Sequence, residues 1–297
     1  MRIDLHTHSR ASDGTQTPTE LVHAAKAAGL DVVALTDHDT SAGWDEATTA
    51  AHDVGITLVK GMEISARIVA GPGVHLLCYL PDPTYPPLVE GLRLVLDGRN
   101  DRVPRILDAL REHEVDLTLD DVHAVAGEPA AIGRPHVADA MVRAGVVRDR
   151  DEAFADWLGW GGKAFVPRYA ASVDDMLAAI TGAGGVAVIA HPWGRVDHGP
   201  DGGALGEATM ARLKELGLAG IEVDHQDHRP QARAALRAIA RNLDLVVTGS
   251  SDHHGDGKVD HDLGCNTTDP EEYARLLERA AASSAASGRE TPQVVVP

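Results

Sequence analysis

Residues 1–9 read MRIDLHTHS, and this stretch places two histidines, His6 and His8, at the end of a short apolar run. Alternate side chains of an extended strand point to the same face, so His6 and His8 are expected to lie side by side. Two neutral imidazoles on one face form a ready pair of metal ligands. The start of the chain therefore predicts a strand that ends in a metal site.

The rest of the chain repeats this arrangement of an apolar run followed by polar residues. Helical segments separate the runs, and the first helix, residues 18–28, begins at a capping box formed by Thr17 and Glu20. Further runs of strand length cover residues 32–36, 56–59, 74–79, 186–190, 220–223 and 245–249. Strands that alternate with helices predict a parallel sheet, and polar residues at many carboxyl ends favour a barrel, because these ends converge at one rim.

The regular alternation breaks between residues 87 and 182, which are mostly helical in pattern and more charged. We therefore predict an α/β barrel domain of residues 1–97 and 166–282 with an inserted helical subdomain of residues 98–165. The small, polar residues 283–297 predict a flexible tail. An open, doubly wound sheet is the alternative, but no glycine-rich dinucleotide motif follows the first strand.

Composition narrows the classes of partner. The 297 residues carry a formal net charge of −18, which repels nucleic acid backbones and argues against an extended nucleic-acid surface. No apolar run reaches the roughly 18–20 residues that span a bilayer, so no membrane partner is expected. The N-terminus shows no charged-then-apolar leader, which predicts a cytoplasmic location. A small phosphorylated substrate remains compatible with the charge.

Histidines and carboxylates lie at or near most of the predicted strand ends. These residues are His6, His8, His38, Glu63, His75, His191, Asp252 and His254. Such a cluster without a metal would bury polar groups at high cost, and imidazole plus carboxylate without thiolate suits Zn, Mn or Fe. The ligands are too many for one ion, so Glu63 is expected to bridge two ions roughly 3.5–4 Å apart. Asp13 and His38 could supply a third site together with His254.

Five motifs in order resemble the PHP (polymerase and histidinol phosphatase) family. They are MRIDLHTHS with Asp13-Gly14, Thr36-Asp37-His38-Asp39, Gly61-Met62-Glu63, Ala190-His191-Pro192 and Ser251-Asp252-His253-His254. The resemblance covers most of the chain and implies a distorted seven-stranded, TIM-like (β/α) barrel with two to three divalent metal ions. It implies that the first ion is held by His6, His8, Glu63 and Asp252, the second by Glu63, His75 and His191, and the third by Asp13, His38 and His254.

The resemblance also implies an activity. The inserted helices and the segment Arg134-Pro135-His136 resemble the stand-alone branch that includes nucleoside 3′,5′-bisphosphate phosphatases, also described as trimming 5′ ends of short RNAs. We therefore predict a metal-dependent phosphoesterase in which a hydroxide that bridges the metals attacks a phosphate ester. The expected target is the 3′-phosphate of such a bisphosphate. The predicted catalytic residues are Asp252, His191 and Glu63, with Asp252 or a nearby histidine relaying the proton to the leaving alkoxide.

Arg134 is the leading candidate to bind a second phosphate, because a guanidinium matches phosphate bidentately. The other interpretation of Arg134 is a surface or structural ion pair. The further substrate-binding candidates are His136, Lys163, Arg195 and His225. Arg99 and Arg102 are weaker candidates, since basic residues on a helix usually interact only with solvent. We expect a monomer or small homo-oligomer.

Other activities stay open at this point. Histidinol phosphate and a cyclic sugar phosphate are alternative substrates within the same reaction class. An amidohydrolase shares an early His-x-His and a late strand-end aspartate, but it commonly uses a lysine bridge where this chain offers Glu63. A non-catalytic PHP module would show missing ligands, and none is missing here.

Overall fold

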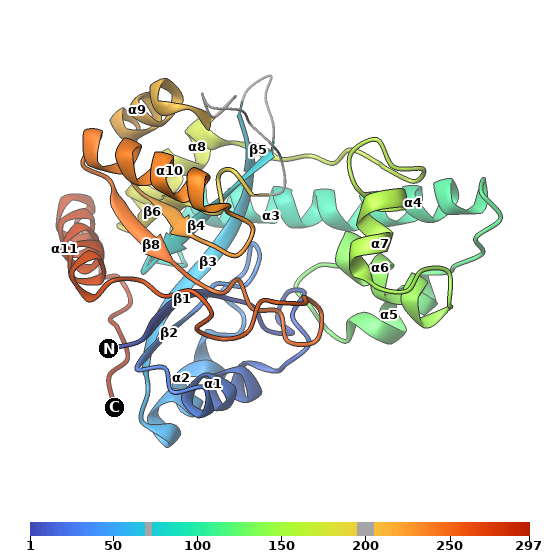
Figure 1. Ribbon diagram of the computed structural model, residues 1–297, viewed down its shortest axis with the longest axis horizontal. Helices are drawn as coiled ribbons and strands as arrows, with labels where there is room; N and C mark the ends of the chain where they lie inside the picture. Colours follow the sequence, from blue (N-terminus) through green and yellow to red (C-terminus); the bar gives the residue numbers. More distant parts are fainter. Residues whose placement is uncertain (69–72, 195–204) are drawn as a thin grey trace.

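The computed structural model describes residues 1–68, 73–194 and 205–297. Its sheet follows the order β1-β2-β3-β4-β6-β7-β8, and a short strand β5 (Ala171–Ser172) pairs with β3 beside this path (Figure 1). The strands are β1 (Ile3–Thr7), β2 (Val32–Leu35), β3 (Thr57–Arg67), β4 (Gly73–Tyr79), β6 (Val186–Ile189), β7 (Leu218–Asp224) and β8 (Val246–Gly249). The sheet curls into a half-barrel, so the predicted α/β class is confirmed and the barrel only in part.

The two ends of this sheet approach each other without a strand pair between β1 and β8 among the described residues. An isolated bridge joins Thr7 to His253, and the His8 N–H donates to the His253 carbonyl at 2.9 Å. The residues that follow β1 and β8 therefore lie side by side, which brings the first and last predicted ligands together.

The prediction of an all-parallel sheet is wrong at β4, which runs antiparallel to both β3 and β6. Only residues 68–72 separate β3 from β4, too few for the crossover that a parallel pair needs. The reversal has a consequence for the site. The amino end of β4, which carries His75, lies at the same rim as the carboxyl ends of the parallel strands, and His75 pairs in register with Ser65 of β3.

Helices cover the sheet and bury its apolar residues. They are α1 (Pro18–Ala27), α2 (Trp44–Val54), α3 (Pro86–Asn100), α8 (Val173–Gly182), α9 (Glu207–Glu215), α10 (Pro230–Asn242) and α11 (Pro270–Ser287). The predicted capping box at the start of α1 is confirmed, because Thr17 and Glu20 each accept from the other's backbone N–H. No described helix is both long and apolar enough to cross a membrane.

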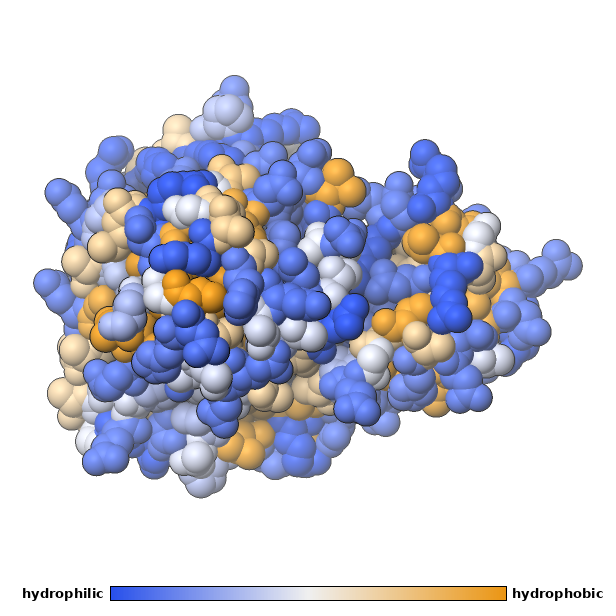
Figure 2. Space-filling view, turned by 90° about the horizontal axis from the view of Figure 1, so that it is seen from below, coloured by the Kyte–Doolittle hydropathy of each residue, from blue (hydrophilic) through white to orange (hydrophobic). Residues whose placement is uncertain are grey.

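A second group of helices extends to one side of the sheet (Figure 1). This helical unit comprises α4 (Arg102–Arg111), α5 (Leu119–Ala126), α6 (Arg134–Arg143), α7 (Arg150–Ala153) and the π-helical turn η1 (Phe154–Leu158). It has its own apolar core, which begins at Val103 and ends at Val166, and it forms a smaller lobe in Figure 2. The core supports the predicted insertion at residues 98–165, whose limits stay a prediction.

The end of the chain differs from the predicted flexible tail at residues 283–297. Helix α11 continues to Ser287, and the hydroxyl of Ser283 donates to the Gly185 carbonyl at 2.8 Å. Beyond the helix, Leu58 and Val295 exchange two backbone hydrogen bonds of 2.9 Å. This part of the chain is thus hydrogen-bonded to Gly185, which precedes β6, and to Leu58 of β3.

Candidate active site

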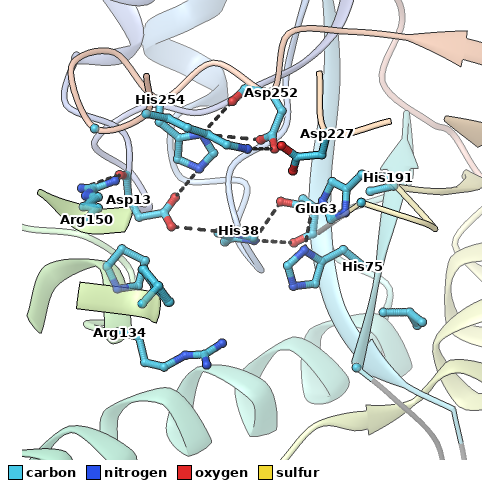
Figure 3. A pocket seen from close by; sticks show the side chains of 18 of the residues that line it. Asp13, His38, Glu63, His75, Arg134, Arg150, His191, Asp227, Asp252 and His254 are labelled. Atoms are coloured by element: carbon cyan, nitrogen blue, oxygen red, sulfur yellow. Dashed lines mark hydrogen bonds and ion pairs between the residues drawn. The ribbon is translucent and has the colours of Figure 1, made fainter. Parts of the chain in front are cut away.

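A cavity of about 340 Å³ lies between the rim of the sheet and the helical unit. Its sheet side is lined by seven of the predicted ligands: Asp13, His38, Glu63, His75, His191, Asp252 and His254. All three predicted catalytic residues are among them. Figure 3 shows these side chains pointing toward one another, with Arg134 and Arg150 on the side of the helical unit.

The first ligand group forms at the bottom of the cavity from His6, His8, Glu63 and Asp252. The Nε2 atoms of His6 and His8 lie 3.0 Å apart, as the strand alternation predicted. Glu63 Oε2 lies 3.3 and 3.2 Å from these two nitrogens, and Asp252 Oδ1 lies 3.5 and 3.4 Å from them. Four donor atoms from three segments of the chain therefore face one point, and all four residues are buried.

The second ligand group uses the other oxygen of the same glutamate. Glu63 Oε1 lies 2.7 Å from His75 Nδ1 and 3.1 Å from His191 Nε2. Glu63 stands inside β3, which extends past the predicted strand end to Arg67. The carboxylate therefore presents one oxygen to each group, which is the arrangement a bridging ligand requires.

The third ligand group consists of Asp13, His38 and His254. Asp13 Oδ2 lies 3.6 Å from His38 Nε2, and Asp13 Oδ1 lies 3.3 Å from His254 Nε2. The Nδ1 atom of His8 also faces this group, 3.8 Å from Asp13 Oδ1, and it is buried without a hydrogen-bond partner. The imidazole of His8 thus lies between the first and third groups.

These donor sets fit divalent metal ions. Imidazoles and carboxylates converge in each group, six of the nine residues are buried, and no thiolate is among them. Outer contacts also orient the ligands: Glu222 Oε1 lies 3.1 Å from His6 Nδ1, and the Asp252 carbonyl lies 2.9 Å from His254 Nδ1. Each contact leaves Nε2 directed at its group, as is usual around metal-binding histidines.

Mutual electrostatics shift the pKa values of these groups. Burial disfavours the imidazolium of His8, but hydrogen bonds with Asp252 and Glu63 raise its pKa to about 9. Burial also disfavours the carboxylate of Glu63, but His75, His38 and His6 hold its pKa well below the usual range. The carboxylates therefore stay ionised and draw a positive charge into the group, which a proton supplies when no cation is bound.

Metal binding should consequently release protons. The pKa of His8 is raised, so its proton is present below about pH 9 and must leave before the nitrogen can ligate. We expect Mn²⁺ affinity to rise roughly tenfold per pH unit for each proton released, up to about pH 9. Titration calorimetry in two buffers of different ionisation enthalpy measures the proton count. An affinity that stays flat across this range would contradict the assigned protonation of His8.

Left-handed backbone conformations place several of these side chains. His191 has a φ of 28° and Asp252 a φ of 54°, which non-glycine residues rarely adopt. Asp252 and His254 also stand two residues apart, but they do not repeat the strand geometry of His6 and His8, because β8 ends at Gly249. A turn at Asp252, rather than strand alternation, brings the two side chains together. Such strain is typical of functional sites.

Gly14 permits the turn that follows Asp13. A Cβ atom at this position would lie 2.5 Å from the His8 carbonyl oxygen, closer than packed atoms allow. Gly14→Ala should therefore destabilise the fold by about 1–3 kcal/mol, measured as a lower Tm in thermal unfolding. Gly73→Ala is the matched control, because its Cβ would meet nothing closer than 3.8 Å. Equal Tm values for the two variants would show that the turn adapts.

Five arginines line the cavity and form an arginine wall: Arg99, Arg102, Arg134, Arg150 and Arg168. Arg102 is the most exceptional, since it is only 4% exposed and its Nε atom is buried without a hydrogen-bond partner. Burial, together with Arg134, Arg168 and Arg99, lowers the pKa of Arg102 to about 8. Burial and Arg99 also lower the pKa of Arg168 to about 10. The wall thus concentrates positive charge that an anion would stabilise.

The predicted substrate-binding residues differ in whether they line the cavity. Arg134 lines the cavity, and one of its Nη atoms donates to the Leu158 carbonyl at 3.0 Å. His136, Lys163 and His225 are not among the described residues that line it. His136 and His225 are buried in other contacts, and the Lys163 ammonium lies 4.3 Å from the Trp157 ring centre. Arg195 lies outside the described residues.

Several residues of the site were missed by sequence reasoning. Glu222 stands within the buried strand β7, and an acidic residue in an apolar strand is a signal that could have identified it. Lys258, whose ammonium contacts Asp252 Oδ2, follows the last ligand in a polar loop. Arg150 and Arg168 carry no pattern that separates them from surface arginines.

Comparisons with known proteins agree with this geometry. The PHP domain family matches residues 4–145. A 5′-3′ exoribonuclease of Haemophilus influenzae is 37% identical over 254 residues, which cover 85% of this chain and 90% of that protein. A 3′,5′-nucleoside bisphosphate phosphatase of Chromobacterium violaceum is 35% identical over 262 residues, covering 88% and 90%.

A solved structure from Bifidobacterium adolescentis, assigned as a metal-dependent phosphoesterase, superimposes with a TM-score of 0.87 at 39% identity, covering 93% of this chain and 96% of that one. This similarity extends over both the sheet and the helical unit. The predicted enzyme class, a metal-dependent phosphoesterase, is confirmed. The ligand groups, their order along the chain and these relatives together show that the chain belongs to the PHP family.

Proposed function

We propose that this phosphoesterase removes the 3′-phosphate of a nucleoside 3′,5′-bisphosphate and binds the other phosphate at the arginine wall. The observation that carries this proposal is the buried guanidinium of Arg102, which faces the cavity among three other guanidiniums. A single-phosphate substrate at the ligand groups would leave this charge unbalanced. The similarity to a bisphosphate phosphatase at 35% identity supports the same substrate class.

We assign the metal ions to the three ligand groups in the order that the resemblance implies. His6, His8, Glu63 and Asp252 would hold the first ion, Glu63 with His75 and His191 the second, and Asp13 with His38 and His254 the third. Two to three ions of Mn, Fe or Zn suit these donors. When bound, such ions lower the pKa of water, orient the phosphate and neutralise its developing charge.

The protein's own groups would position the substrate. Arg102, Arg134 and Arg168 line the same cavity as Glu63 and His191, and Figure 3 shows Arg134 on the side of the helical unit. Their guanidiniums would hold the second phosphate bidentately and so place the 3′ ester at the ligand groups. Arg99 contributes less directly, because its Nε is already paired with Asp39 Oδ2 at 2.8 Å.

Asp252, as a carboxylate, is the proposed relay that would take a proton from the attacking water and pass it to the leaving alkoxide. Its Oδ1 faces the first ligand group, whereas its Oδ2 lies 3.2 Å from His225 Nε2 and contacts Lys258. Asp227 N–H donates to His225 Nδ1, so the proton of this imidazole lies on Nε2 and points at Asp252. The carboxylate is therefore held by two donors at the wall of the cavity.

Trimming of the 5′ end of a short RNA is a second candidate. The relative at 37% identity is named a 5′-3′ exoribonuclease, and the same arginine wall would accept a terminal phosphate. The net charge of −18 disfavours a long RNA track, so a short oligonucleotide is the form that this reaction would use.

Histidinol phosphate fits the cavity less well, because it places a cationic amine opposite an arginine wall. A cyclic sugar phosphate stays an alternative substrate. An amidohydrolase commonly uses a lysine bridge at the place where this chain has Glu63. A cytoplasmic location, a monomer or small homo-oligomer and closure of the half-barrel into a distorted seven-stranded barrel stay predictions.

A substrate panel tests the proposal. The Mn²⁺- or Zn²⁺-loaded enzyme is assayed for phosphate release from nucleoside 3′,5′-bisphosphates, nucleoside monophosphates, histidinol phosphate, a cyclic sugar phosphate and an aryl phosphate. We expect kcat/KM for the bisphosphate to exceed that for each monophosphate by at least about 10²-fold, the size of a charged subsite. Equal values for all of them would contradict a second phosphate site.

A further inference from the structure

The loop of residues 9–14 carries Asp13, the carboxylate of the third ligand group. On the sheet side, Asp37 holds this loop by three hydrogen bonds: the Ser9 N–H donates at 2.8 Å, and the hydroxyls of Ser9 and Ser12 each donate at 2.6 Å. All of these groups are buried. One wall of the loop is therefore fixed by the sheet.

On its other side, the loop accepts hydrogen bonds from the helical unit and from the segment that joins its helices. Three successive backbone carbonyls are the acceptors. The Ala11 carbonyl accepts from the Ala130 N–H at 3.1 Å, the Ser12 carbonyl from His136 Nε2 at 3.0 Å, and the Asp13 carbonyl from both Nη atoms of Arg150 at 3.2 Å. An insertion that served only to cover the cavity would not need these contacts.

The two side chains in this contact are themselves held in place. Arg150 is bound by Asp139 of α6 through two hydrogen bonds of 2.6 Å, and its side chain is only 13% exposed. The Gly133 N–H donates to His136 Nδ1 at 3.0 Å, so the imidazole proton lies on Nε2 and points at the Ser12 carbonyl. His136 also stands in the first turn of α6, which presents Arg134 to the cavity.

We propose that Arg150 and His136 are positioning residues, through which the helical unit sets the place of Asp13 in the third ligand group. Arg150 contacts the backbone of the residue whose side chain lies 3.3 Å from His254, so a shift of this carbonyl moves the carboxylate. The inference rests on the proposed function, in that the third group holds a metal ion. It assigns to His136 a role other than the substrate contact predicted for it.

Mn²⁺ titration of the full chain tests this inference by stoichiometry and affinity. Asp13→Asn identifies the ion of the third group as the one that this variant loses. Arg150→Ala should lower the affinity for the same ion by about 10–100-fold and leave the affinities for the other ions within about twofold of the wild type. It should also speed amide hydrogen exchange in residues 9–15. Arg150→Lys, which retains one donor, should restore part of the affinity.

Arg148→Ala is the matched control, because Arg148 lies two residues away and its side chain is 82% exposed in a pair with Glu152. It should bind Mn²⁺ as the wild type does. An Arg150→Ala protein with unchanged affinity for the third ion, or with all ions weakened alike, would overturn the positioning role. If the proposed function is wrong, the wild-type enzyme will not turn over bisphosphates, and this result is distinct from any change in metal binding.

Discussion

Replacing Glu63 with glutamine should lower kcat by at least about 10³-fold and reduce the amount of bound metal. Glu63 is 1% exposed and is the only carboxylate whose two oxygens face the first and second ligand groups within the described residues. The neutral amide removes the negative charge that both groups share. It also removes the Glu63 carboxylate, which together with Asp252 raises the pKa of His8.

The measurement is kcat on an aryl phosphate together with metal content at a fixed Mn²⁺ concentration. Glu90→Gln provides the control, since Glu90 lies on the exposed face of α3 in a surface pair with Arg93. A Glu63→Gln enzyme with full metal content and activity within about tenfold of the wild type would rule out a bridging carboxylate.

Replacing Arg102 with methionine should affect the turnover of two substrates of the wild-type enzyme differently. Methionine keeps most of the side-chain volume but removes the charge. We expect kcat/KM for a nucleoside 3′,5′-bisphosphate to fall by about 10²–10³-fold, because a buried phosphate would lose its cationic partner. Turnover of an aryl phosphate should stay within about threefold, since that substrate has no second phosphate.

The free protein offers an independent readout for Arg102. Burial and three other guanidiniums lower the pKa of Arg102, because they disfavour its positive charge. The Arg102→Met variant should therefore have an unchanged or higher Tm in the absence of anions. Added inorganic phosphate should stabilise the wild type more than Arg102→Met. Arg105→Met, on an exposed position of the same helix, should behave as the wild type in every assay. Equal losses on both substrates would show that Arg102 supports the fold rather than a phosphate.

Part of the site could be predicted from the spacing of histidines and carboxylates at strand ends, and their division into three groups from the resemblance to the PHP family. His6 and His8 reveal their shared face through strand alternation, and His191 reveals its place through the apolar run before it. The nine predicted ligands do converge, in three groups of which the first and second share Glu63. Their roles as ligands stay predictions, because convergence alone does not bind an ion.

The remaining features depend on tertiary contacts that the sequence pattern does not encode. The apolar run of β4 looks the same in either direction, so its antiparallel course and the place of His75 at the rim were hidden. Arg102 and Arg105 both stand on α4, yet one is buried at the cavity and the other faces solvent. Only the docking of the helical unit distinguishes them, and the same docking gives Arg150 and His136 their partners.

The position of the phosphate that is removed tests the central claim most directly. Phosphorus NMR of the metal-loaded enzyme with a nucleoside 3′,5′-bisphosphate identifies both products during turnover. We predict inorganic phosphate and the nucleoside 5′-monophosphate, because the arginine wall would retain the 5′-phosphate while the 3′ ester lies at the ligand groups. Release of the nucleoside 3′-monophosphate, or no reaction with metals bound, would contradict the proposed function.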